Sequence, residues 1–156
     1  MANYESANGY FPYGVIYGSA GCGPFSANRH WQAAMITDGL SNTMFMGEVI
    51  QALNDTDFDM RGDFFNDDIG AAQFMTLYTP NSGIDSMGHW NLTPSPDPGP
   101  VGGGDVYVSA RSRHPGGVNV VFGDGSVQFI TNQISVDVWR SLSTMTADDL
   151  ISGSGY

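Results

Sequence analysis

His114 and Asp124 are two residues whose types and spacing suggest chemistry, because a histidine and a carboxylate can form a catalytic dyad or hold a metal ion. They belong to the stretch R-H-P-G-G-V-N-V-V-F-G-D-G-S-V-Q-F-I, which occupies 113–130. If 118–122 is an extended strand at about 3.3 Å per residue, its ends lie about 15 Å apart. We therefore expect no dyad. Instead, His114 should hydrogen-bond a loop carbonyl or a carboxylate, and Asp124 should bond to its own turn.

A second candidate site is the acidic segment N-D-T-D-F-D-M-R-G-D-F-F-N-D-D at 54–68. Alternate carboxylates on a curling loop can converge as hard oxygen ligands for Ca²⁺. An EF-hand is excluded, because its sixth position is Met60 instead of Gly and its twelfth is Asn66 instead of Glu. The segment is then either a solvated acidic face or a looser Ca²⁺ site. The ligands of that looser site would come from Asp55, Asp57, Asp59 and Asp63, together with Asn66, Asp67 and Asp68.

The third candidate is the polar block formed by Asp38, Ser41, Asn42 and Glu48. Asp38 precedes a glycine, which is typical of a turn, and Ser41 and Asn42 can cap local backbone groups. A hydrolytic triad would join Ser41 to one of the three histidines, yet the chain has no G-x-S-x-G elbow. We therefore expect no catalytic residue here and no enzymatic activity.

The charge balance restricts the partners of the chain. Its formal net charge is −11, and its five basic residues are all arginines. Nucleic acids and anionic lipids both require a basic surface, so we expect neither nucleic-acid binding nor membrane contact by this segment. Divalent cations are the favoured charged partners. The single cysteine, Cys22, cannot form an internal disulfide.

Length and composition predict a single globular domain over 1–156. Hydrophobic residues make up 41% of the chain, which favours a folded core, while 21 glycines and only 13% charged residues favour turns and short strands. We expect an α+β, β-rich fold: an antiparallel sheet with a C-terminal hairpin, few short helices and long Gly/Pro loops.

The β elements of this fold can be placed along the sequence. A tight hairpin is expected over 118–130, with its turn at Gly123-Asp124-Gly125. A core strand is expected over 43–51, with Glu48 near a sheet end and the alternating residues Met44 and Met46 on one face. Another strand is expected over 106–110.

The remaining segments are expected to be loops and one helix. The Pro/Gly-rich stretch 80–105 is expected to form a long internal loop. Loops of this length often have a function. Ser135 or Asp137 can cap a short helix whose residues Val138, Trp139 and Leu142 share one face.

Three blocks in order along the chain resemble a known family. They are I-T-D-G-L-S-N-T at 36–43 followed by G-E-V at 47–49, T-P-N-S at 79–82, and a histidine nine residues before Asp-Gly. In this pattern the chain resembles bacterial prepilin-like (pseudopilin-like) proteins of unassigned function that carry an H-x9-DG signature. The residues that match are Asp38, Gly39, Ser41, Asn42, Glu48, His114, Asp124 and Gly125.

The opening residues depart from that family, because M-A-N-Y-E-S-A-N-G-Y contains neither a leader nor an apolar helix. We expect Met1 to begin an excised, processed or shortened portion. The resemblance implies a pseudopilin-head-like fold and a structural subunit of an extracellular or envelope-associated filament or secretion pseudopilus, a homo-oligomer or an assembly with other pseudopilins. The alternative is a secreted calcium- or carbohydrate-binding module. The candidate interface anchors are Tyr10, Phe11, Tyr13 and Trp31.

Overall fold

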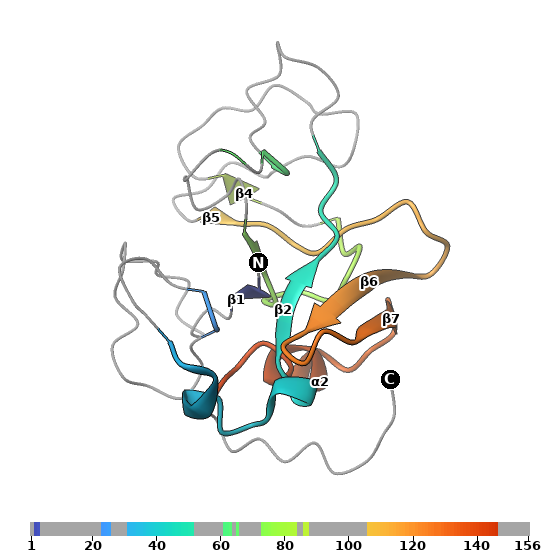
Figure 1. Ribbon diagram of the computed structural model, residues 1–156. Coiled ribbons are helices and arrows are strands. Elements are labelled where there is room, and N and C mark those ends of the chain that lie inside the picture. Colours follow the sequence, from blue (N-terminus) through green and yellow to red (C-terminus); the bar gives the residue numbers. More distant parts are fainter. Residues whose placement is uncertain are drawn as a thin grey trace.

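A three-stranded antiparallel sheet forms the centre of the protein (Figure 1). Its strands are β2 (Met44–Gly47), β6 (Gly117–Phe122) and β7 (Val127–Thr131), in the order β2-β6-β7. The few helices are short, which confirms the expected α+β, β-rich class. The computed structural model describes residues 2–3, 23–25, 31–51, 61–63, 65, 73–83, 86–87 and 106–146.

Strands β6 and β7 form the hairpin that the sequence predicts. The amide of Phe122 donates to the carbonyl of Ser126 (2.9 Å), and the amide of Gly125 donates to the carbonyl of Phe122 (2.9 Å). Gly125 has φ of 85°. A three-residue loop that ends in a left-handed residue matches the right-handed twist of its strands, and glycine adopts that conformation without a Cβ clash.

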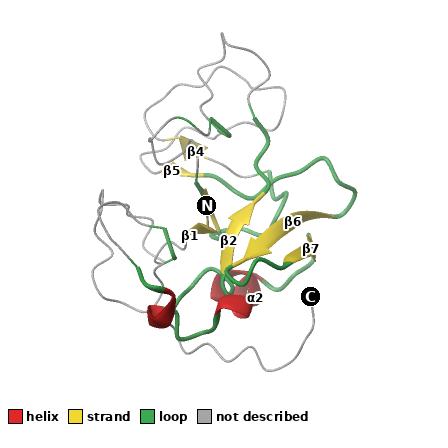
Figure 2. Cartoon of the chain, viewed as in Figure 1, coloured by secondary structure: helices red, strands yellow, loops and turns green. Residues whose placement is uncertain are grey.

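The inner face of the sheet carries the core. Val118, Val120 and Phe122 are fully buried, as their alternation predicts, and they pack with helix α2 (Val136–Ser141). Figure 2 shows this helix against the end of the sheet where β2 begins. The core comprises Met44, Phe74, Ala110, Val118, Val120, Phe122, Ile130, Ile134, Trp139 and Leu142.

Helix α2 begins where the sequence predicts but is not capped as expected. Ser135 occupies the N-cap position, yet its side chain makes no capping hydrogen bond. The helix is held by its apolar face instead. Trp139 stacks on Phe74 with ring centroids 6.2 Å apart, and its indole N–H donates to the carbonyl of Tyr78 (2.9 Å).

Strand β2 is shorter than the expected 43–51, and the expectation that Met44 and Met46 share a face is wrong. Met44 pairs with Phe122 and Met46 with Val121, so the register shifts between the two methionines. Such a bulge turns the residues that follow it to the opposite face. Met44 is consequently buried, whereas 52% of Met46 is exposed.

Phe45, the residue within this bulge, packs outside the main core. It lies edge-on to Phe25 with ring centroids 5.5 Å apart. It also borders a small second cluster around the buried residues Ile36 and Met145. The bulge thereby joins the sheet to the segment 31–40, which contains the 3₁₀ helices η1 (Ala33–Met35) and the start of η2 (Leu40–Asn42).

Two further strand pairs are very short. Strand β1 (Ala2–Asn3) runs parallel to β3 (Phe74–Met75), and β4 (Ser86–Met87) runs antiparallel to β5 (Val106–Tyr107). The expected strand 106–110 is therefore limited to β5 and an isolated bridge from Ser109 to Met75. The expected loop 80–105 contains β4, and 84–85 and 88–105 lie outside the described residues.

Candidate functional site

The antiparallel pairing of β2 with β6 brings two of the sequence blocks together. Glu48 directly follows β2, and its amide donates to the carbonyl of Asn119 on β6 (3.3 Å). The loop 112–116 precedes β6 and carries His114 to the same end of the sheet. Glu48 and His114 are 66 residues apart in the chain but meet at this sheet end.

The Glu48 carboxylate makes contacts through both of its oxygens. Its Oε1 lies 3.0 Å from Nε2 of His114 and accepts a hydrogen bond from the Asn119 side-chain amide (3.2 Å). Its Oε2 accepts the backbone N–H of Asn119 (2.8 Å). The histidine thus meets a carboxylate, one of the two kinds of partner expected from the sequence. Its ring also lies edge-on to Phe129, with centroids 6.4 Å apart.

These contacts set the ionisation of Glu48. Burial alone would raise the pKa of this carboxyl group, but the hydrogen bonds from Asn119 and His114, with the attraction of the His114 ring, outweigh it. The pKa of Glu48 therefore lies below its ordinary value of 4.5, and the folded protein holds the group as a carboxylate.

Asn81, from the T-P-N-S block, holds the loop that presents His114. Its Oδ1 accepts the backbone N–H of Ser112 (2.9 Å), and its Nδ2 donates to the carbonyl of Gly117 (3.2 Å) and to Oδ1 of Asn132 (2.9 Å). Asn81 has φ of 55°, a left-handed conformation that asparagine tolerates better than most residues. The side-chain amide thereby links both ends of the loop to the residue after β7.

Ser112 completes the support of this loop. Its hydroxyl donates to the carbonyl of Gly117 (2.7 Å) and accepts the backbone N–H of His114 (3.1 Å). Ser112 and Asn119 were not singled out from the sequence, and Asn81 only as part of a block. The signal available in the sequence was local: an asparagine within a Pro-Asn turn, and a serine two residues before the histidine.

The other end of β6 is built from the first block and the hairpin turn. The amide of Gly123 donates to the carbonyl of Thr43 (2.9 Å), and the amide of Asp124 donates to the carbonyl of Leu40 (3.2 Å). Hydrogen bonds from Ser126, including its backbone N–H to Oδ1 (2.9 Å), lower the pKa of Asp124. Asp124 thus bonds to its own turn, as expected, and β6 separates it from His114.

The residues of the first block are held by one local and one long-range hydrogen bond. Gly39 has φ of 93°, which confirms the turn at this point. The side chain of Asn42 donates to the carbonyl of Asp38 (2.9 Å), and Oδ2 of Asp38 accepts the hydroxyl of Thr144 (3.3 Å). Ser41 is exposed and lies apart from the Glu48 contacts, at the far end of β2.

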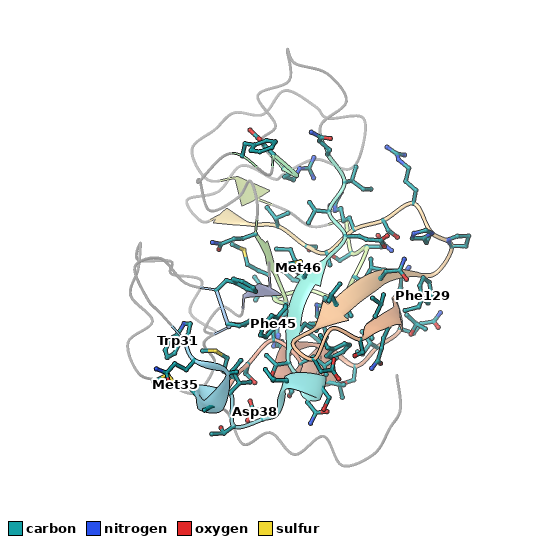
Figure 3. All side chains as sticks on the ribbon, viewed as in Figure 1. Trp31, Met35, Asp38, Phe45, Met46 and Phe129 are labelled. Atoms are coloured by element: carbon teal, nitrogen blue, oxygen red, sulfur yellow. The ribbon has the colours of Figure 1, made fainter. Side chains whose placement is uncertain are left out.

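The remaining predicted site residues are described only in part. Among the proposed calcium ligands, Asp63 accepts the backbone N–H of Phe65 (3.2 Å), and 55, 57, 59 and 66–68 lie outside the described residues. Within the described ranges, no group of three or more metal-ligating side chains is placed to hold a metal ion. Of the aromatic anchors, Trp31 is half-buried beside the Ile36–Met145 cluster (Figure 3), and 10, 11 and 13 fall outside the described ranges.

Glu48→Gln is expected to destabilise the protein by about 1–2 kcal/mol at neutral pH, because an amide supplies one acceptor oxygen where the carboxylate supplies two. Since the folded state lowers the pKa of Glu48, its ionised form stabilises the fold above pH 4.5. That contribution is lost as the pH falls through the folded pKa. Denaturant titrations at several pH values should thus show the difference between wild type and Glu48→Gln shrinking in acid.

The matched control is Asp124→Asn, which makes the same change of carboxylate to amide at the exposed turn. Its Oδ1 can still accept the Ser126 amide, so this variant should stay close to wild type at neutral pH. An equal loss of stability in both variants at pH 7 would mean that general charge, and not the three contacts on Glu48, determines the effect.

None of the helices in the described ranges combines the length and the apolar character needed to cross a membrane.

Comparison with known proteins gives one family. The profile of a family described as "Protein of unknown function (DUF1559)" matches residues 1–137. No curated protein and no solved structure gives a match. The matched region includes each of the blocks that meet around β6. Because it covers most of the 156 residues, the chain belongs to the DUF1559 family, which is associated with prepilin-like and pseudopilin-like proteins.

Proposed function

We propose that this chain is a structural subunit, the globular domain of a pilin-like assembly at the cell surface or envelope. The assembly would be an extracellular or envelope-associated filament or a secretion pseudopilus, built from copies of this chain or with other pseudopilins. The observation that carries the proposal is membership of the DUF1559 family. The H-x9-DG pattern of the sequence agrees with that membership.

The geometry of the motif residues supports a structural role. The Glu48 carboxylate accepts hydrogen bonds at both oxygens, and the Asn81 amide group is bonded through both its oxygen and its nitrogen. Asp124 bonds within its own turn. These side chains fix the position of the 112–116 loop and of the hairpin turn. We therefore propose that the family pattern specifies a fold, with no enzymatic activity attached to it.

Electrostatics makes the proposed assembly testable. Copies of a chain with a net charge of −11 repel one another, and salt shortens the range of that repulsion to about 10 Å at 0.1 M. Self-association should therefore strengthen as salt rises from about 10 mM to about 0.5 M. Light scattering would follow the mean mass, and electron microscopy would show whether the product is a filament.

A parallel calcium series separates screening from binding. If Ca²⁺ acts only as a counterion, Mg²⁺ at equal concentration should have the same effect. A larger effect of Ca²⁺ that chelator reverses would instead indicate a specific site. A protein that stays monomeric throughout both series while binding an oligosaccharide would contradict the structural role and favour a secreted binding module.

A further inference from the structure

Strand β7 lies at the edge of the central sheet. The order β2-β6-β7 gives it one hydrogen-bonded neighbour, β6, among the described strands. The hydrogen bonds at the two ends of the hairpin show which residues face that neighbour: Phe122 donates to Ser126, and Asn132 donates to Gly116. In an antiparallel ladder such residues alternate. The backbone groups of Gln128 and Ile130 therefore point toward β6, and those of Val127 and Phe129 point to the free edge.

The same two residues are exposed on the outer face of the sheet. Val127 is 64% exposed and Phe129 is 45% exposed. Met46, Val121 and Val127 pair in one row across the three strands, so one row of apolar side chains crosses this face. Figure 3 marks Met46 and Phe129 on the two outer strands. Val127 and Phe129 lie side by side on the edge strand itself, and exposed apolar residues that adjoin, unlike scattered ones, indicate an interaction surface along that edge.

The edge also lacks the usual protection against pairing. Edge strands are commonly blunted by lysine, proline or an inward charge. The sequence V-Q-F-I-T of β7 contains none of these, and no charged residue occurs between Asp124 and Asp137. In a chain of net charge −11, this is a stretch where two copies can approach with little direct repulsion.

We infer that β7 pairs with β7 of a second copy, antiparallel and across a twofold axis, to join two three-stranded sheets into one. The inference rests on the proposed self-assembly and identifies the strand through which two copies meet. An antiparallel pair of identical strands is self-complementary, because each outward N–H meets an outward carbonyl of the partner. With Phe129 at the axis, the N–H and carbonyl of Phe129 bond to those of the same residue in the second copy. Val127 then lies opposite Thr131.

The expected dimer is weak. Pairing of two short strands buries less than the roughly 1,200 Å² of a standard stable interface. It should therefore form at high protein concentration, or within a larger assembly that raises the local concentration.

Hydrogen exchange of the wild-type protein, measured by NMR over a concentration series, tests the pairing directly. The amides of Gln128 and Ile130 should be protected at every concentration because they bond to β6. The amides of Val127 and Phe129 should exchange fast when dilute and slow as the protein associates. Association without protection of these two amides would overturn the inference.

Charge substitutions at the axis test the register. Phe129→Lys places two like charges opposite each other and removes an aromatic pair, so the dissociation constant should rise at least about tenfold. The dissociation constant should rise even though the substitution reduces the net negative charge of each chain. Met46→Lys makes the same charge change on the same face, but on β2, and should leave dimerisation unchanged. Circular dichroism and thermal melting would establish that both variants fold.

A mixture of Phe129→Lys with Phe129→Glu provides the rescue. The mixed pair has the same total charge as two wild-type chains, and it sets opposite charges against each other at the axis. Sedimentation velocity should therefore show dimers in the mixture but not in either variant alone. Absence of dimers in the mixture would overturn the proposed register.

The outcomes separate this inference from the proposed function. A wild-type protein that stays monomeric at all concentrations and salt levels overturns both. A wild-type protein that self-associates equally well after Phe129→Lys overturns the β7 contact and leaves the structural-subunit role in place.

Discussion

Val120→Asp is expected to abolish the cooperative thermal unfolding of the protein. Val120 lies in the middle of the central strand, is fully buried, and packs in the core shared by the sheet and helix α2. A carboxylate at this position would lose its hydration without a partner, at a cost of several kcal/mol. Because single domains are stable by only about 5–15 kcal/mol, that cost is comparable to the whole stability. Differential scanning calorimetry should show no unfolding peak.

The matched control is the neighbouring residue. Val121 faces the other side of the sheet and is only half-buried, so Val121→Asp should retain a cooperative transition with a loss of about 1 kcal/mol. If Val120→Asp melts cooperatively at the wild-type temperature, the inner face of β6 is not part of the core.

Gly117→Ala is expected to lower the Tm by about 10 °C, which corresponds to about 3 kcal/mol in a domain of this size. A Cβ on Gly117 would lie 2.2 Å from the carbonyl oxygen of Ile130 and 2.7 Å from Cζ of Phe129. The carbonyl belongs to the β7 backbone, so relief of the clash would require the two strands to separate. Gly117 is the first residue of β6, so it also adjoins the loop that carries His114.

Gly116→Ala is the control for this steric clash, because it tests the cost of a left-handed backbone conformation alone. Gly116 has φ of 85°, but a Cβ there meets nothing within 4 Å. Its substitution should therefore cost only the penalty of a left-handed alanine, about 1–2 kcal/mol. Thermal melts of the two variants, followed by circular dichroism, give the comparison. Equal losses would show that the close approach of β6 and β7 is not what requires glycine at 117.

The hairpin could be predicted from the sequence because its signals are local. Val118, Val120 and Phe122 alternate with less buried residues, and a Gly-Asp-Gly turn follows directly. The same kind of local pattern placed α2, where Trp139 and Leu142 fall on one face. Burial and turn chemistry act over a few residues, so reading the sequence is enough for such elements.

The bulge in β2 and the support of His114 could not be predicted in this way. Nothing in the run of residues after Thr43 tells Met44 from Met46, and only the pairing with β6 reverses their faces. Asn81 contacts Ser112 and Asn132 across 31 and 51 residues, respectively. The sequence showed that His114 would need a partner and gave the type of group, a carbonyl or carboxylate. The identity of that partner, Glu48, depends on the pairing of β2 with β6, which brings Glu48 to the end of the sheet where His114 lies.

The long-range bonds around the first block determine when this protein can fold. Thr37 bonds to the carbonyl of Met145, 108 residues further along, and Thr43 bonds to that of Thr144, 101 residues further along. Strand β2 likewise obtains its sheet neighbour from the second half of the chain. Closing such loops costs entropy before any contact compensates for it, which makes folding slow. During synthesis, β2 therefore leaves the ribosome without its neighbour and stays unpaired until β6 and α2 have been made.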